Sequence, residues 1–79
     1  MEFDDYVTSR LNEIETKIIN WLILGMTNKQ IGEKIFLSSH AVKYYLAKLY
    51  KKFGVINRNN LVYILAQHVI KKENCQDAE

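Results

Sequence analysis

The residues with the clearest chemical potential are a group of bases in the middle of the chain. Residues 38–58 contain five bases and no acid, whereas the whole chain has a formal net charge of only +2. The bases are Lys43, Lys48, Lys51, Lys52 and Arg58. Ammonium and guanidinium groups neutralise phosphates and release their counterions, so this unopposed charge indicates a nucleic-acid backbone as a partner. A solvated helix face is the other interpretation of the same charges.

Catalytic chemistry has little support in the sequence. His40, His68 and Cys75 could act as nucleophiles or bases, but they lie far apart and no motif connects them. Two histidines without paired carboxylates do not make a metal site, and one cysteine cannot form a disulfide within the chain. We therefore expect a protein that is not an enzyme and that holds no metal and no cofactor.

The size and composition predict one small helical domain. The chain has 79 residues, no proline and only three glycines, which disfavours a β-barrel or sandwich with its many tight turns. The N-terminus is acidic where a signal peptide would be basic, and the longest apolar run, residues 18–25, is interrupted by Asn20. The predicted fold class is all-α, and the expected location is the cytoplasm, without membrane contact.

Two helices are predicted after a loose N-terminal arm at residues 1–10. The first begins behind Asn12, which can form a capping box with Glu15, and is expected to stop at Gly25. The second covers residues 28–35 behind Thr27 as its N-cap. It contains Gly32, which lowers helix propensity and implies a tight crossing with another helix.

The third predicted helix begins at Ser38 or Ser39 and runs to about Phe53, before Gly54. Helical spacing places one apolar stripe toward the core, and the stripe consists of Val42, Leu46, Leu49 and Phe53. The opposite face holds His40, Tyr44, Ala47 and Lys51, flanked by Lys43 and Lys48. Tyr45 is predicted at the edge of the core, and Trp21 of the first helix within it.

A fourth helix is predicted from residues 57–59 to about Lys71, followed by a polar tail at residues 72–79. Leu61, Ile64 and Leu65 form its core stripe. A second apolar face consists of Val62, Tyr63, Ala66, Val69 and Ile70. The two apolar faces together are larger than the core of one small domain can cover. We expect a second copy of the chain to cover this face, and the alternative is that residues 1–10 fold back over it.

A short helix, a turn and a longer helix with a cationic outer face form the arrangement that places a helix in the DNA major groove. On that helix Lys43 can donate to guanine O6 and N7, and Ala47 allows close approach to base edges. Tyr44 can stack, bind a phosphate or touch a thymine methyl group. The lysines at the sides can neutralise phosphates.

The stretch TNKQIGEKIFLSSHAVKYYLAKLYKKFGVINR resembles the DNA-binding domain of LuxR/FixJ/GerE-type bacterial transcription regulators. The family pattern runs S/T-N-K-E-I-A, then I-S-x-x-T-V-K-x-H, then K-L-G-V-x-x-R. The matching positions are Thr27, Asn28, Lys29, Ile31, Ser38, Val42, Lys43, Lys52, Gly54, Val55 and Arg58. The resemblance covers about residues 11–66, within an expected domain at residues 11–71.

The resemblance implies a four-helix helix-turn-helix domain of LuxR/GerE type, whose third helix reads DNA and whose fourth pairs two chains on a near-palindromic site. By position, it implies base contacts for Lys43, Tyr44 and Ala47. The phosphate contacts it implies are those of Thr27, Lys29, Lys52 and Arg58. We add His40 near the bases, and Lys48 and Lys51 near phosphates, from the charge and the helical wheel.

The sequence also departs from the family pattern. Ala41 replaces the usual threonine, Tyr45 the usual histidine, and Ile14 and Lys17 replace residues that form an ion pair in the first helix. The length resembles small stand-alone members of the GerE type, which implies a regulator without a sensor or receiver domain. RNA polymerase or another regulator is a further expected partner. The alternative function is a protein-interaction module that pairs with a full-length regulator and antagonises it.

Overall fold

The computed structural model describes residues 2–70 and shows five helices. They are α1 (Asp5–Thr8), α2 (Glu13–Leu22), α3 (Asn28–Ile35), α4 (Ser39–Phe53) and α5 (Arg58–Gln67). The predicted all-α class is confirmed, and the four predicted helices are α2 to α5. Within residues 2–70, extended pairing is limited to one isolated bridge between Phe3 and Val69.

The helix ends follow the capping signals in the sequence. The Asn12 side chain accepts from the Glu15 N–H at 2.9 Å, and the Glu15 carboxylate accepts from the Asn12 N–H at 3.0 Å, which completes the predicted capping box. Thr27 caps α3, and Ser38 rather than Ser39 caps α4. The α2 helix ends at Leu22, three residues before the predicted stop, and Gly25 lies in the following turn with a φ of +88°.

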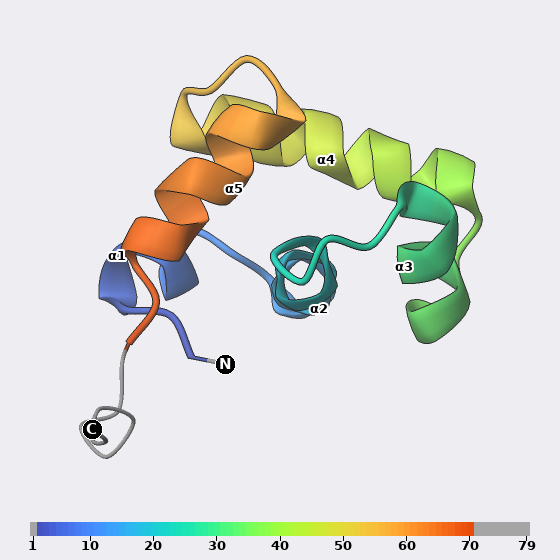
Figure 1. Ribbon diagram of the computed structural model, residues 1–79, viewed down its shortest axis with the longest axis horizontal. Coiled ribbons are helices and arrows are strands. Elements are labelled where there is room, and N and C mark those ends of the chain that lie inside the picture. The colour runs from blue at the N-terminus through green and yellow to red at the C-terminus, as the bar shows by residue number, and fades with distance from the viewer. Residues whose placement is uncertain (1, 71–79) are drawn as a thin grey trace.

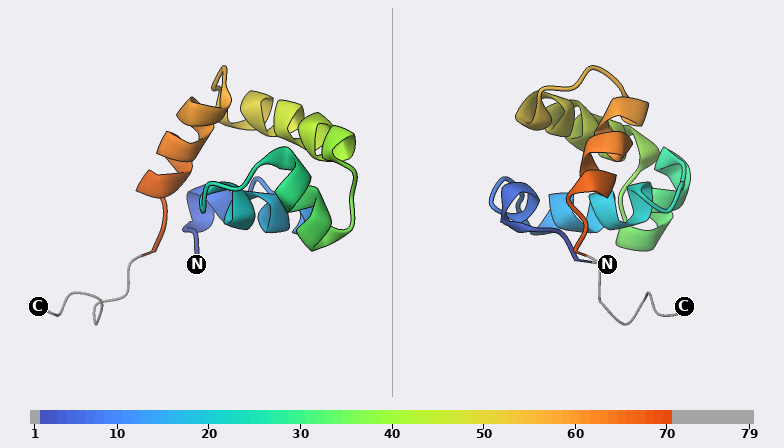
Figure 2. Two further views of the ribbon diagram at one scale, coloured as in Figure 1. Left: turned by 45° about the vertical axis from the view of Figure 1, so that its right-hand side comes forward. Right: turned by 60° about the vertical axis from the view of Figure 1, so that its left-hand side comes forward.

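The core forms where α4 lies across α2 and α3 (Figures 1 and 2). The predicted stripe of α4, Val42, Leu46, Leu49 and Phe53, is buried, as expected from its spacing. The stripe packs with buried residues of the other helices, namely Ile18, Ile19, Leu22, Ile31, Leu61 and Leu65. Tyr45 and Trp21 are partly buried against this core. The α5 helix lies over the C-terminal part of α4, and its far end reaches α1 (Figure 1).

The close approach expected at Gly32 is made by the turn rather than by another helix. A Cβ atom on Gly32 would overlap the carbonyl oxygen of Leu37, and the Leu37 N–H donates to the Gly32 carbonyl at 2.8 Å. Phe36, between these residues, adopts left-handed backbone angles and ends α3. Because Gly32 has no side chain, the α3–α4 turn can pack directly against the backbone of α3.

The expectation of a loose arm at residues 1–10 is wrong, because most of this segment is packed. Phe3 and Val7 are buried in the core, and α1 begins behind Asp4 as its N-cap. The Asp4 N–H donates to the His68 carbonyl at 2.9 Å, and the Ile70 N–H donates to the Glu2 carbonyl at 2.8 Å. The arm therefore pairs with the segment that follows α5.

This pairing also corrects the predicted end of the last helix. The sequence predicts a helix to about Lys71, but α5 ends at Gln67, and backbone groups of residues 68–70 pair with the arm. Partners in the arm replace the hydrogen bonds that further helical turns would have made. Lys71, the tail at residues 72–79 and Cys75 lie outside the described residues.

Side-chain contacts also join the arm to the residue that follows α5. The His68 Nδ1 lies 2.8 Å from the Asp4 Oδ2, and the Tyr6 ring stacks on the His68 ring at 4.4 Å between centroids. The hydrogen bond from His68 lowers the pKa of Asp4 below its ordinary value of 3.8. The negative charge of Asp4 therefore stabilises the contact between the arm and the end of α5.

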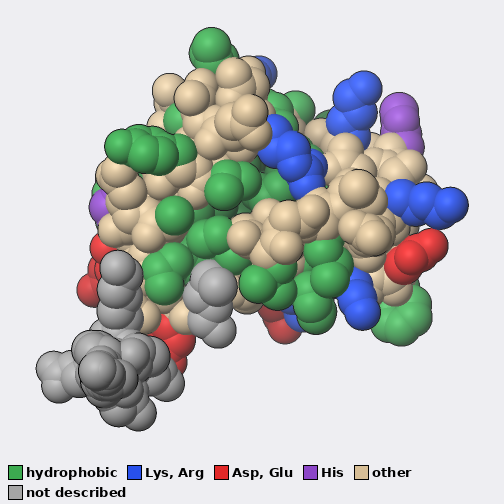
Figure 3. Space-filling view, viewed as in Figure 1, with side chains coloured by type: hydrophobic (Ala, Val, Ile, Leu, Met, Phe, Trp, Pro, Cys, Tyr) green, Lys and Arg blue, Asp and Glu red, His purple; other side chains and the backbone are tan. Residues whose placement is uncertain are grey.

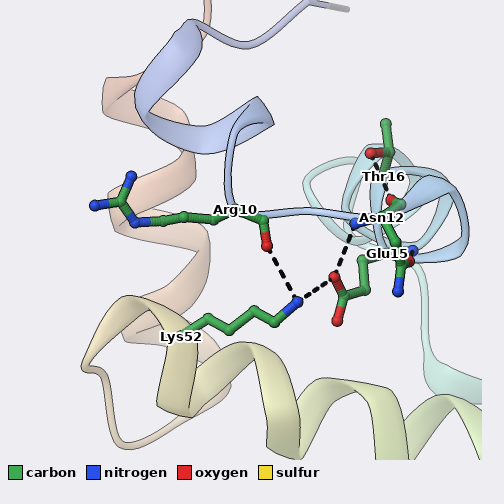
Figure 4. A network of polar contacts seen from close by, with 5 residues as sticks. All are labelled: Arg10, Asn12, Glu15, Thr16 and Lys52. Atoms are coloured by element: carbon green, nitrogen blue, oxygen red, sulfur yellow. Dashed lines mark hydrogen bonds and ion pairs between the residues drawn. The ribbon is translucent and has the colours of Figure 1, made fainter.

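An ion pair joins α2 to the last turn of α4 (Figure 4). The Glu15 side chain is only 1% exposed, and its Oε1 lies 2.6 Å from the Lys52 Nζ. The same ammonium donates to the Arg10 carbonyl at 3.1 Å. A buried carboxylate needs such partners, because desolvation penalises its charge. Lys52 therefore stabilises the junction of the arm, α2 and α4.

Replacing Val7 with alanine tests whether the arm belongs to the folded core. Val7→Ala should lower the free energy of unfolding by about 2 kcal/mol, because it removes methyl groups from a fully buried site. Urea denaturation followed by circular dichroism measures the change. The control is Thr8→Ala at the exposed neighbouring position, which should stay within about 0.5 kcal/mol of the parent. Equal stabilities of the two variants would contradict the packing of the arm.

A pair of lysine variants tests the ion pair. Lys52→Met keeps the aliphatic stem but leaves the Glu15 carboxylate without its cation, so it should destabilise the fold by about 1–3 kcal/mol. Lys51→Met changes the neighbouring exposed lysine and should have an effect within about 0.5 kcal/mol. Thermal and urea unfolding of both variants decides the question, and matching losses would show that Lys52 has no special structural role.

Candidate nucleic-acid interface

The outer face of α4 carries the residues that were predicted to meet DNA. His40, Lys43, Tyr44, Ala47, Lys48 and Lys51 are all exposed. The buried stripe fixes this orientation, because residues on the opposite side of a helix must point outward when one side is packed. The structure therefore brings six predicted residues onto one continuous face.

Tyr44 lies at the centre of this face and has neighbours on two sides. The Lys48 Nζ lies 4.9 Å from the centroid of the Tyr44 ring, and the Tyr45 ring meets Tyr44 edge-on at 5.7 Å. Both arrangements are favourable for an aromatic ring. Beside the ring, a small hollow with mostly apolar walls is lined by Tyr44, Ala47, Lys48 and Lys51.

A second group of predicted residues meets at the start of α3. An open pocket there is lined by Thr27 and Lys29 together with Gly25, Met26, Asn28 and Arg58. The backbone N–H groups at a helix N-terminus and nearby cations together favour an anion such as phosphate. Thr27 also caps the helix, since its hydroxyl accepts from the Gln30 N–H at 3.1 Å.

Arg58 at this pocket is already engaged within the fold. Its guanidinium donates to the Asn28 side-chain oxygen at 2.8 Å and also to the Met26 carbonyl. These contacts join the start of α5 to the loop that precedes α3. Arg58 therefore positions the α3 N-terminus, and only part of its hydrogen-bonding capacity is left for an external anion.

Lys52 is the one predicted lysine of α4 that the structure separates from the others. Its ammonium lies on Glu15 and the Arg10 carbonyl, at the junction described above. The family resemblance predicted a phosphate contact for Lys52, and neither that pattern nor a charge count shows which cations are paired within the fold.

Two residues that matter for the site were not singled out as partners by the sequence analysis. Glu15 was recognised as a helix cap but not as the partner of Lys52, and Asn28 was recognised as a pattern match but not as the acceptor for Arg58. An acid among the apolar residues Leu11, Ile14 and Ile18 is a signal that could have indicated a buried ion pair.

The face of α5 that was predicted to contact a second copy is partly buried and partly exposed. Tyr63 is 65% exposed, and Ala66 and Ile70 are also exposed. Val62 and Val69 are half-buried against the core, and Val69 pairs with Phe3 of the arm. The arm therefore covers one part of the second apolar face and leaves another part open.

Charged and hydrophobic side chains lie in different regions of the surface. Figure 3 shows Lys and Arg side chains over the half that carries α3 and α4, and hydrophobic side chains across the middle of the same face. Among residues 2–70, no group of three acids, histidines or cysteines is placed to bind a metal ion, and none of the helices has the length and apolar character of a membrane span.

Comparison with known proteins identifies the family. Residues 9–65 match the family described as bacterial regulatory proteins, luxR family. The transcriptional activator protein BjaR1 of Bradyrhizobium diazoefficiens is 29% identical over 70 residues, which cover 89% of this chain and 29% of BjaR1. The CsgBAC operon transcriptional regulatory protein of Escherichia coli is 38% identical over 52 residues, which cover 66% of this chain and 24% of that protein.

A further relative is the DNA-binding transcriptional activator DevR/DosR of Mycobacterium tuberculosis, with 38% identity over 50 residues, or 63% of this chain and 23% of that protein. The chain thus spans about a quarter of the length of the curated relatives it matches. No solved structure matches significantly. The family consists of DNA-binding transcription regulators rather than enzymes. The chain therefore belongs to the luxR family of bacterial regulatory proteins and contains that family's helix-turn-helix DNA-binding domain.

Proposed function

We propose that this chain binds double-stranded DNA sequence-specifically as a transcription regulator in the bacterial cytoplasm, with α4 in the major groove. The observation that carries the proposal is the outward face of α4, where lysines surround Tyr44 and Ala47 and no acid occurs between residues 38 and 58. A helix presented in this way fits the width of the major groove. The family membership supports DNA as the partner.

The exposed residues divide into two roles. Lys43 donates to a guanine edge, and Tyr44, Ala47 and His40 lie close to neighbouring bases. Lys48 at the side of α4, Lys51 in its last turn, and Thr27 and Lys29 at the start of α3 hold phosphates. Lys52 pairs with Glu15, and Arg58 donates to Asn28. We therefore assign these two residues mainly a structural role, and a phosphate contact only in addition to it.

We propose further that two copies pair through the open part of the α5 face, Tyr63, Ala66 and Ile70, and bind a near-palindromic site. The half-sites would lie about one helical turn apart, so that both α4 helices enter the groove from the same side. RNA polymerase or another regulator is a further partner in this proposal. The exposed apolar side chains support pairing, because water contact with them is unfavourable.

Duplex binding at two salt concentrations tests the main proposal. Fluorescence anisotropy with a random duplex and with duplexes selected from a genomic library should show binding that weakens steeply from 50 to 200 mM salt, as phosphate contacts require. The selected duplexes should bind at least about a thousandfold more tightly than the random one. Absence of salt-sensitive binding would reject the proposal and favour the protein-interaction alternative, in which the open α5 face captures another regulator.

Substitution of single lysines separates base reading from phosphate binding. Lys43→Ala should weaken binding to a selected duplex by about 1–3 kcal/mol and relax the preference at one base pair. Lys51→Ala should weaken all duplexes alike and reduce the salt slope by about one unit. Lys17→Ala removes an exposed charge from α2 and serves as the control. Equal losses on selected and random duplex for both α4 variants would contradict the division of roles.

Pairing of two copies is tested at Tyr63. Tyr63→Asp places a charge in the open α5 face and should shift sedimentation from dimer toward monomer, with weaker binding to a two-half-site duplex. Leu24→Asp is the matched control, since Leu24 is an equally exposed apolar residue (61%) in the α2–α3 turn. Binding of only one copy of the parent protein to the two-half-site duplex would exclude α5 pairing.

A further inference from the structure

The hollow on the outer face of α4 has walls of unusual chemistry for a phosphate-binding surface. Tyr44, Ala47, Lys48 and Lys51 lie at successive positions on one side of the helix and enclose a small space with mostly apolar walls. The lysine ammonium groups lie at the ends of flexible stems, whereas the methyl group of Ala47 and the ring of Tyr44 form the apolar part. The hollow therefore offers no built hydrogen-bonding partner except at its edge.

Tyr44 is held in position at this hollow. Its ring meets Tyr45 edge-on at 5.7 Å between centroids and has the Lys48 Nζ at 4.9 Å. Tyr45 in turn packs partly against the core. Because the ring already has these two neighbours before binding, an apolar group that enters gains contact with little further ordering of the Tyr44 side chain.

The charges around the hollow select the partner. Lys48 and Lys51 line it, Lys43 precedes Tyr44 in the sequence, and no acid occurs on α4. An apolar protein segment would have to bury or displace these cations, whereas duplex DNA brings phosphates that neutralise them. The occupant must therefore be an apolar group carried by a polyanion.

The major groove of DNA exposes one such group. Thymine carries a C5-methyl group there, while the other base edges present hydrogen-bond donors and acceptors. We propose that the hollow between Tyr44 and Ala47 receives the methyl group of a thymine, so that these two residues specify a T·A pair next to the base read by Lys43. This inference rests on the proposed function, because it requires α4 in the major groove.

Deoxyuridine substitution tests the proposal directly. A duplex is selected from a random library by the full chain, and each thymidine in it is replaced in turn by deoxyuridine, which lacks only the methyl group. At one position in each half-site the affinity should fall by about three- to fivefold, the value of burying one methyl group. A T·A to C·G change at that position should lose more, and 5-methylcytosine in place of cytosine should restore part of the loss.

Variants of Tyr44 test whether the hollow causes the difference in affinity between thymidine and deoxyuridine. Tyr44→Ala should abolish the difference between thymidine and deoxyuridine at that position, whereas Tyr44→Phe, which keeps the ring, should retain it. Tyr44 is 58% exposed, so neither variant should disturb the fold, and circular dichroism confirms this. Lys17→Ala should leave the discrimination unchanged.

The outcomes distinguish this inference from the function it rests on. Specific, salt-sensitive binding without any effect of deoxyuridine would overturn the methyl site and leave the regulator function intact. A deoxyuridine effect that persists in Tyr44→Ala would also overturn it, because another residue would then contact the methyl group. Failure to select any preferred duplex would overturn both proposals.

Discussion

The burial of one apolar stripe on α4 determines what the rest of the molecule can do. Val42, Leu46, Leu49 and Phe53 are packed against α2, α3 and α5, and this packing fixes the rotation of α4 about its own axis. A rotation by half a turn would expose the stripe and bury the lysines, at a cost far above the stability of a small domain. The outward cationic face is therefore a consequence of core packing and does not depend on contacts among the lysines.

Two of the cations that were predicted to hold phosphates also support the framework of the fold. Lys52 pairs with the buried Glu15 and links α2 to the end of α4, while Arg58 links the start of α5 to the loop before α3. Both contacts act at the ends of the helices that form the helix-turn-helix unit. They join the end of α4 to α2 and the start of α3 to α5, so the helix-turn-helix unit is anchored to the rest of the fold at both of its ends.

Sequence analysis predicted those features that depend on local signals. Asn12, Thr27 and Ser38 cap their helices through residues only three positions away, and the α4 stripe follows from helical periodicity alone. The expectations of a loose arm and of a longer last helix were wrong because both features depend on contacts between distant parts of the chain. The arm pairs with residues more than 60 positions later, Lys52 pairs with Glu15 across 37 positions, and neither segment carries a periodic signal that names its partner. The candidate site residues of α4 were predictable as one face, but which of the cations pair within the fold was not.

The packed arm changes what a second copy can meet. Backbone groups of residues 2–4 pair with residues 68–70, so the end of α5 is shaped by the N-terminal arm of the same chain. The apolar surface that remains open, Tyr63, Ala66 and Ile70, is narrower than the face expected from the sequence, and a narrow apolar strip supports weaker association than a broad one. Weak pairing through α5 would make binding to two half-sites depend on DNA itself, because phosphate contacts by two α4 faces would supply the free energy that the protein contact lacks.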